Sequence, residues 1–404
     1  MPASPSLLIV PARFKTGKLY TQIATTSAGV VLGSSGDFNV TRATTATRFN
    51  SAGLIESVAS GVPRLDYYTS GGTAGCPALL VEPAATNLAL HSRDLTNAVW
   101  SGTTVTTAKN AVGADGVASG ATTITATAAS GTVLQALSHA STGRIFSAYI
   151  RRVTGTGAIQ LTTNGGTNWD TVTITSGYTQ VASVARTVAS GTVGIRLAVS
   201  GDVIEVDFTQ GEVGPVATSP IATTSGTVTR NADQITVTGA VSGCIGQTQG
   251  TIYAEFRYLG VPSIRSGFVY LRTGGGFRGF SINYSTADLP LGIRFESRNA
   301  NGTTSIQLTS GLTVGAYYKI AIAYDTGGTA AGGTQASGVT AYVNGSPATV
   351  SVGDLRVPST DLNEVRLYGA ISGSDSETPN GNIRSVALYT TKLSNAELAA
   401  ITTP

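Results

Sequence analysis

The sequence predicts an all-β protein, built as an irregular N-terminal region followed by two β-sandwich (jelly-roll) domains. Apolar and polar residues alternate with a period of two in many short segments, for example in residues 171–175, where Val172 and Ile174 share one face. Turns rich in Gly, Ser and Asn separate these segments, and Asn344-Gly345 between apolar runs is a strong hairpin signal. With 50 glycines among 404 residues and many β-branched side chains, the composition disfavours long helices.

The spacing of these segments divides the chain into three regions. Residues 1–95 hold few alternating segments, and we expect an irregular N-terminal anchoring or oligomerisation region there. Strand-like segments fill residues 96–222 and again residues 230–404, and a joint rich in Thr and Ser separates them. One helix is expected at the end of the chain, where Ser394 and Glu397 have the spacing of a capping box.

The charge pattern argues against several classes of partner. Only 12% of the residues are charged, and 25 basic against 22 acidic residues give a net charge of +3. The arginines are spread singly except for Arg151-Arg152, so no basic stripe is present that could neutralise a nucleic-acid backbone. No apolar run approaches the roughly 20 residues of a membrane span, and the first residues lack the cationic segment of a signal peptide. We expect neither a nucleic-acid partner nor membrane insertion.

Metal and cofactor sites are not expected either. His91 and His139 are the only histidines, and neither has a second His or a Cys at ligand spacing. No glycine-rich phosphate-binding motif occurs, which argues against a nucleotide cofactor. Acidic loops at Asp325 and at residues 375–380 could supply oxygen ligands for calcium. Turns select the same residues for local hydrogen bonds, and we favour that interpretation.

One pair of carboxylates has a spacing that suggests catalysis. Glu205 and Asp207 would point to the same face of a strand, near the carboxylate separations that glycosidases use. The alternative is a polar strand edge on which Val206 and Phe208 pack inward. We favour the alternative because two spaced carboxylates are common, and we expect no catalytic residues and no enzymatic activity.

A polar turn carries the candidate glycan contacts. Trp169 stands between Asn168 and Asp170, and an exposed indole beside such side chains could stack on a sugar ring. The more ordinary interpretation is that the indole packs over the sandwich edge, because exposed indoles are costly. Trp100 is expected in a core for the same reason.

Several motifs follow one another in the first 235 residues. They are the segments Asp37-Phe-Asn-Val-Thr-Arg42, Val62-Pro-Arg64-Leu-Asp66, Val81-Glu82-Pro83, Ala217-Thr218-Ser219-Pro220 and Arg230-Asn-Ala-Asp233. This succession, from about residue 7 to residue 235, resembles a module of tailed-bacteriophage virion proteins, of the tail-fibre, head-fibre or decoration type. The resemblance implies a carbohydrate-binding-module-like jelly roll after the first region.

The last block has its own marks. Tyr342-Val-Asn344-Gly345 follows a strand-like segment, and residues 381–398 combine a final strand with the capped helix. This ending resembles concanavalin A-like, laminin-G-like lectin domains. Such a resemblance implies a sandwich fold and leaves the ligand open, because the same fold has many functions. Glucanases of that fold carry a third acid after a pair like Glu205 and Asp207, and Thr209 stands there in this sequence.

Together these patterns and resemblances lead to one functional expectation. We expect a non-enzymatic structural protein of the virion, a fibre, spike or decoration, that attaches weakly and multivalently to host-surface glycans. Its partners would be capsid or tail proteins and further copies of itself, as a homotrimer, and we expect these neighbours to order residues 1–95. The alternatives are a virion depolymerase that uses Glu205 and Asp207, and a secreted bacterial lectin, which the absence of a signal sequence disfavours.

Overall fold

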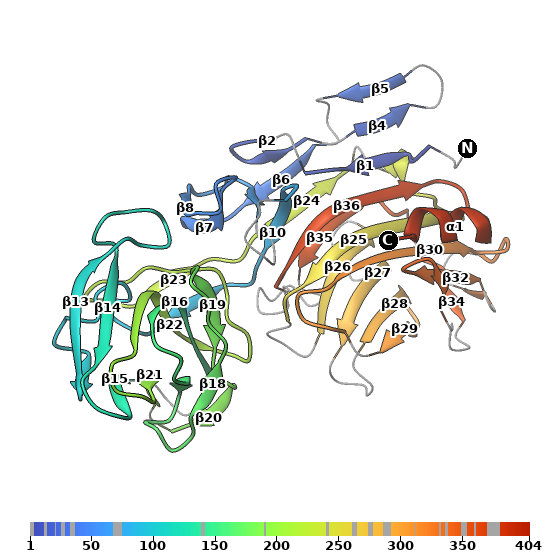
Figure 1. The fold of residues 1–404 in the computed structure, drawn as a ribbon. Coiled ribbons are helices and arrows are strands. Elements are labelled where there is room, and N and C mark those ends of the chain that lie inside the picture. The colour runs from blue at the N-terminus through green and yellow to red at the C-terminus, as the bar shows by residue number, and fades with distance from the viewer. Residues whose placement is uncertain are drawn as a thin grey trace.

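A computed structural model gives the fold of the protein, and strands dominate it (Figure 1). The all-β prediction is confirmed: among the described residues, the only α-helix is α1 (Asn395–Thr402), beside one 3-10 turn, η1 (Ser242–Cys244). No helix in this part of the chain is long and apolar enough to span a membrane. The structure describes residues 4–11, 14–20, 22–25, 29–32, 37–67, 75–138, 142–189, 191–239, 242–260, 265–273, 278–285, 292–310, 312–330, 333–335, 338–348, 354–358, 361–369 and 380–404.

The first sandwich consists of two antiparallel sheets. One has the order β12 (Ser101–Thr103), β15 (Gly131–Leu137), β21 (Gly191–Leu197), β17 (Ile159–Thr162), β18 (Asp170–Val172). The other has the order β13 (Val105–Ala111), β14 (Ala121–Ala126), β22 (Val203–Val213), β16 (Thr142–Thr154), β19 (Thr179–Ala182), and β20 (Arg186–Val188) also pairs with β16. Alternate side chains of these strands, such as Ile124, Phe146 and Ile195, form the core between the sheets. Trp100 belongs to this core, as predicted, and its Nε1 donates to Leu90 O at 3.1 Å.

The second sandwich is larger and also has two sheets. One runs β33 (Ser346–Pro347), β32 (Val339–Val343), β30 (Tyr317–Asp325), β25 (Gln249–Tyr258), β36 (Gly381–Tyr389), β1 (Leu7–Ile9), β4 (Gln22–Thr25), β5 (Gly29–Leu32), with β10 (Ala78–Val81) on β36 and β9 (Arg64–Asp66) on β10. The other runs β2 (Phe14–Lys15), β3 (Lys18–Leu19), β6 (Phe38–Thr41), β24 (Gln234–Thr238), β35 (Glu364–Gly369), β26 (Arg265–Arg272), β27 (Gly279–Ser285), β28 (Gly292–Asn299), β29 (Gly302–Ser310).

Three two-stranded sheets complete the described structure. They are β7 (Ala46–Phe49) with β8 (Ile55–Val58), β11 (Ala85–Asn87) with β23 (Val228–Arg230), and β31 (Thr334–Gln335) with β34 (Leu355–Arg356). The β11–β23 pair joins the chain where it enters the first sandwich to the chain where it leaves, so the joint after that sandwich is held by backbone hydrogen bonds.

Strands β1 to β6, β9 and β10 of the N-terminal region are part of the second sandwich. Leu7 on β1 and Leu79 on β10 pair with Leu388 and Ile383 on β36, and Ser6 Oγ donates to Leu388 O, 382 positions later. This corrects the expectation that neighbouring molecules order residues 1–95, because strands of the same chain do so in the described ranges. The sequence did not reveal it because each strand is only three or four residues long and its partners are distant.

Two local predictions are confirmed in the second sandwich. Ser394 and Glu397 make both hydrogen bonds of the capping box that begins α1. Asn344 and Gly345 form the two-residue turn between β32 and β33, with φ values of +48° and +80°, as a type I′ hairpin requires. Leu393 and Leu398 pack against the outer face of the sheet that contains β30.

Candidate functional site

The predicted glycan contacts lie in the turn between β17 and β18. Trp169 is half-buried, and the guanidinium carbon of Arg196 lies 4.6 Å from the centroid of its ring. Asn168 is exposed, and its Oδ1 accepts a hydrogen bond from Asn164 Nδ2 at 2.9 Å. The arrangement places the indole against a cation, a contact worth about 0.5–1 kcal/mol at exposed sites.

Asp170 has a different role from its two neighbours. Its Oδ1 and Oδ2 accept from Arg186 Nη2 and Nη1 at 2.6 and 2.5 Å, and Val184 N donates to Oδ2. The hydrogen bond with Arg186 lowers the pKa of Asp170. This carboxylate therefore fastens β18 to the start of β20, whereas the side chains of Asn168 and Trp169 keep exposed atoms. The three-residue glycan site stays a prediction.

The carboxylates of β22 both lie next to arginines. Arg151 Nε donates to Glu205 Oε2 at 2.5 Å, and Tyr178 Oη donates to the same oxygen at 3.4 Å. Asp207 is fully buried, and Arg93 Nε and Nη2 donate to its two oxygens at 2.8 and 2.9 Å. Each carboxylate is thus an ion-pair partner within the sandwich.

The packing expected around this pair is only partly correct. Val206 lies in the core of the first sandwich as predicted. Phe208 does not, because a β-bulge opposite Ala148 gives it a φ of +45° and turns it to the outer face, where it packs with Tyr149 and Ile55. Asp207 is buried instead of lying on a polar strand edge, since the N-terminal region covers that face.

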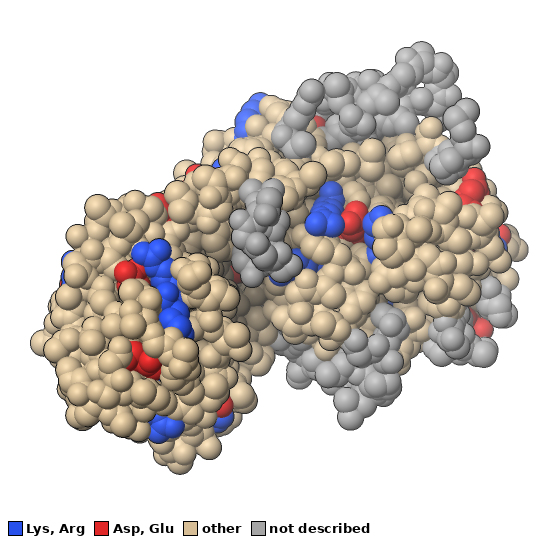
Figure 2. All heavy atoms as spheres, in the orientation of Figure 1, with Lys and Arg blue, Asp and Glu red and all other residues tan. Residues whose placement is uncertain are grey.

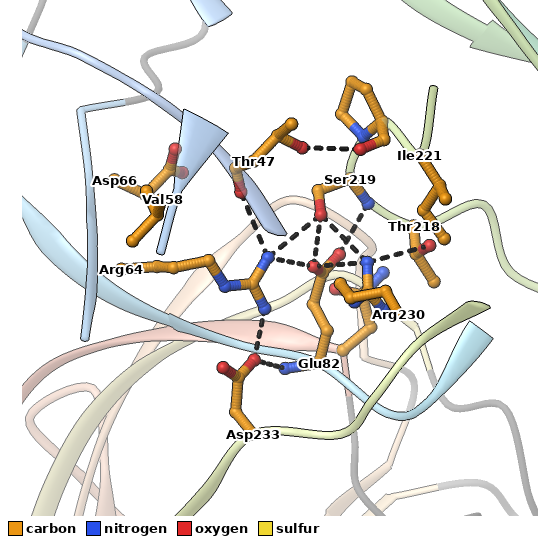
Figure 3. Close-up of polar contacts among 12 residues, drawn as sticks. Thr47, Val58, Arg64, Asp66, Glu82, Thr218, Ser219, Ile221, Arg230 and Asp233 are labelled. Carbon is orange, nitrogen blue, oxygen red and sulfur yellow. Dashed lines mark hydrogen bonds and ion pairs between the residues drawn. The ribbon is translucent and has the colours of Figure 1, made fainter. Parts of the chain in front are cut away.

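The motifs singled out between residues 37 and 233 converge on a buried ion cluster (Figure 3). Arg64 pairs with Asp233 and, through Nη1, with Glu82 Oε2 at 2.5 Å. Arg230 Nη1 lies 2.9 Å from the same Glu82 oxygen, and Arg42 Nη1 lies 2.8 Å from Asp233 Oδ1. We call Arg42, Arg64, Glu82, Arg230 and Asp233 the joint cluster. It connects the N-terminal region to the joint that follows the first sandwich.

The joint cluster is also bonded to the end of the first sandwich. Ser219 N and Oγ donate to the two oxygens of Glu82 at 2.7 and 2.5 Å. Burial alone would raise the pKa of Glu82, but the charges of Arg230 and Arg64 outweigh it and lower the pKa to about 2. Burial raises the pKa of the neighbouring Glu212, whose oxygens accept from Thr218. These bonds give the cluster a structural role, because its guanidinium and carboxylate groups form ion pairs with one another.

A second group of charged side chains lies on the outer face of the sheet that contains β26. Register places Tyr270 beside Arg366 and Ser281, and Ser281 beside Glu296. Side chains two positions away share that face, since successive residues of a strand alternate. We call this set the charged sheet face; its members are Tyr270, Arg272, Ser281, Asn283, Arg294, Glu296, Arg298, Glu364 and Arg366.

The middle of the charged sheet face is deeply buried, and its edge is open. Arg294 and Glu296 are 5% and 6% exposed, whereas Arg298 is exposed. The phenol of Tyr270 lies over Gly267, where a Cβ would meet its oxygen. A recess of about 20 Å³ opens between Tyr270, Glu296 and Arg298.

One polar atom on this face lacks a partner. Asn283 is 0% exposed, and its Nδ2 donates to Ser281 Oγ at 3.1 Å. Among the described residues, nothing donates to its Oδ1. A buried acceptor without a donor is costly.

The charge of the face favours an anionic or polyhydroxylated ligand. Four arginines stand against two glutamates, Glu296 and Glu364, which leaves a formal excess of +2. Glu364 is close to Arg366, with Oε1 3.0 Å from Nη2, and lies 4.0 Å from Arg272 Nη1. Guanidinium groups bind carboxylates, while Glu, Asn, Ser and Tyr side chains can bind hydroxyl groups.

Sequence reasoning missed the charged sheet face. The signal was present in β28, where Arg294, Glu296 and Arg298 alternate with Ile293 and Phe295. Alternation places those three on one face, but it does not tell which strands lie beside them.

The described residues contain no group of His, Cys, Asp and Glu that could hold a metal ion. Asp325 Oδ1 accepts from Gly327 N at 2.8 Å, which is the turn chemistry that we favoured. Asp375 and Glu377, in the other acidic loop, lie outside the described residues.

Comparisons with known proteins match part of the chain. Residues 229–399 match the model of the concanavalin A-like lectin/glucanases superfamily. No curated protein matches the chain. One similar solved structure is the CBM40 domain of the Ruminococcus gnavus IT-sialidase, 20% identical, covering 40% of this chain and 85% of that one, with a TM-score of 0.30. Another is domain 4 of AbnA, a GH43 extracellular arabinanase from Geobacillus stearothermophilus, 12% identical, covering 47% and 81%, with a TM-score of 0.32. Residues 229–399, which include most of the second sandwich, thus resemble the concanavalin A-like lectin/glucanases superfamily.

Proposed function

We propose that this protein is a non-enzymatic structural component of a bacteriophage virion that displays its sandwiches for weak, multivalent binding to host-surface glycans. The observation that carries the glycan part is the charged sheet face, where arginines and hydroxyl-binding side chains line a recess beside the exposed Arg298. The excess of positive charge favours glycans that contain acidic sugars. The concanavalin A-like match of residues 229–399 supports a lectin function for the same domain.

A glycan array probed with the intact protein tests this binding. We expect signals on oligosaccharides that carry carboxylates and weaker signals on their neutral counterparts. Raising the salt concentration should reduce these signals, because the guanidinium–carboxylate contacts at the exposed edge are screened. If a multivalent preparation of the protein bound none of the glycans on the array, the proposed glycan binding would be refuted.

The loop of Trp169, Asn168 and Asp170 is a second proposed glycan contact. It is supported by the exposed atoms of Asn168 and by the partly exposed indole. We expect Trp169→Ala to weaken glycan binding by the isolated first sandwich, residues 84–225. Equal binding by this variant and the parent fragment would leave the indole with a packing role only.

The virion location and the homotrimer are supported by the resemblance of residues 7–235 to virion modules. The uncharged surface also suits close packing between copies: in the view of Figure 2, basic and acidic residues form small mixed groups within a largely uncharged face. Mass spectrometry of purified virions should detect the protein. Light scattering after gel filtration of the free protein should give the mass of three chains. A monomer at micromolar concentration would contradict the trimer.

The proposal excludes catalysis by Glu205 and Asp207. It is supported by their arginine partners, since Arg93 donates to both oxygens of Asp207 and Arg151 donates to Glu205. We expect no release of reducing sugars from host polysaccharide. Release by the parent protein that Glu205→Gln abolishes would establish the depolymerase alternative.

A further inference from the structure

A second cavity lies between the two sandwiches, separate from the charged sheet face. Its volume is about 340 Å³, within the range of small-molecule pockets. Its walls come from the N-terminal region at Phe49 and Asp66, from β16 and β19 of the first sandwich, from residues 215–220 of the joint, and from the second sandwich at Leu259 and Asn380. We call this cavity the interdomain cleft.

Apolar groups form most of the wall of the interdomain cleft. Phe49 and Tyr149 lie with their ring centroids 6.1 Å apart on one side, and Val216 and Leu259 line the cavity as well. A largely apolar cavity at a domain boundary, with a few fixed polar groups, is the usual form of a ligand site.

Asn380 is the polar group that most clearly lacks a partner there. It is 3% exposed, and its Nδ2 donates to Ala217 O at 3.1 Å, which fixes the orientation of the amide. The backbone N of Asn380 donates to Gly260 O, and its carbonyl accepts from Leu259 N. Within the described part of the chain, nothing donates to Asn380 Oδ1. A ligand with a hydroxyl or amide donor would remove the cost of this buried acceptor.

The charges around the interdomain cleft are balanced. Arg48 and Arg257 stand against Asp66 and Glu82. Asp66 accepts from Phe49 N and from Asn382 Nδ2, and burial raises its pKa. A phosphate or sulfate would meet two acidic side chains, and a hydrocarbon chain would leave Asn380 Oδ1 unsatisfied. The ligand that fits is neutral, with an apolar face and donor groups at its edge.

We propose that the interdomain cleft binds one neutral sugar residue. The C–H face of a pyranose would lie against the apolar wall, and a hydroxyl or acetamido N–H would donate to Asn380 Oδ1. This site is independent of the charged sheet face, which takes acidic glycans. A ligand in the interdomain cleft touches both sandwiches and the joint, and so it would also stabilise their relative orientation.

Saturation-transfer NMR and calorimetric titration of the full chain with three methyl glycosides, of glucose, galactose and N-acetylglucosamine, test the proposal. We expect at least one to bind. Asn380→Leu keeps the branched shape of the side chain but removes its polar atoms, the acceptor included, and should weaken that binding about tenfold. Ala182→Phe should abolish it, because this exposed β19 residue lines the cavity and can be enlarged without disturbing a core.

Two controls separate the interdomain cleft from other effects. Ala129→Phe makes the same enlargement at an exposed position of the β14–β15 turn and should bind like the parent. Arg298→Ala, on the charged sheet face, should also retain the neutral glycoside. Failure of all three glycosides to bind, or unchanged binding by Ala182→Phe, would overturn the interdomain cleft as a sugar site and would leave the charged sheet face unaffected.

Discussion

Arg64 on β9 forms a buried ion pair with Asp233, 169 positions later in the chain, and neither side chain is more than 3% exposed. Glu82 and Arg230 extend the pair into the joint cluster. Three segments of the chain, the N-terminal region, the end of the first sandwich and the beginning of the second, are therefore held at one point.

Loss of Arg64 should strongly destabilise the protein. Arg64→Met leaves the carboxylates of Asp233 and Glu82 buried with fewer donors, and we expect a loss of about 3–5 kcal/mol in the free energy of unfolding. Urea unfolding followed by circular dichroism measures it. Lys392→Met removes a surface ion pair with Asp325, whose atoms are 3.7 Å apart, and should cost about 1 kcal/mol or less. Equal losses in the two variants would mean that the joint cluster does not hold the domains together.

The joint cluster should also make stability fall in acid. The pKa of Glu82 is lowered to about 2, so ionised Glu82 stabilises the fold above its ordinary pKa of 4.5. That contribution is lost as the pH falls toward 2. The raised pKa of Glu212 acts in the opposite sense, since its ionisation at higher pH is unfavourable in the fold. Urea midpoints between pH 2 and 6 should vary less in Glu82→Gln than in the parent, and identical pH profiles would contradict this assignment.

The second sandwich should depend on the N-terminal region for its stability. Without residues 1–81, β36 loses the paired strands that contain Leu7 and Leu79. β24 loses its paired strand β6, which contains Val40. We expect a fragment of residues 229–404 to bind a hydrophobic dye and to melt without a cooperative transition. The fragment of residues 84–225 is the control, because its core cluster lies between Ala89 and Val206, and it should melt cooperatively. A cooperative transition in both fragments would show that the N-terminal strands are dispensable.

Local features of the fold could be predicted from the sequence. The Asn344-Gly345 turn and the capping box of Ser394 depend on neighbouring residues, and they form as expected. The burial of Trp100 follows from its size.

Features that depend on distant pairing could not be predicted. Short strands such as β1 carry too little pattern to indicate that they join β36. The bulge at Phe208 depends on the opposing strand β16, and it reversed the expected direction of that side chain. The charged sheet face depends on which strands lie side by side, and the sequence does not indicate that its members meet.

The joint cluster could be predicted from the sequence only in part. Its residues were among the motifs of the resemblance to virion modules, but the motifs alone did not show that Arg42, Arg64, Glu82, Arg230 and Asp233 meet in space. The structure gives these motifs a shared physical purpose, which is to join the two sandwiches through buried charges.

The most direct test of the proposed function is the affinity of the intact protein for an acidic oligosaccharide, measured by titration calorimetry with a clustered ligand. The double variant Arg272→Ala/Arg298→Ala should bind about tenfold more weakly than the parent, because charged hydrogen bonds at the rim of the charged sheet face are lost. Arg384→Ala, which removes an arginine on β36 in the opposite sheet, should bind like the parent. Equal affinity in all three proteins, or no measurable affinity in any of them, would contradict a glycan-binding function for this face.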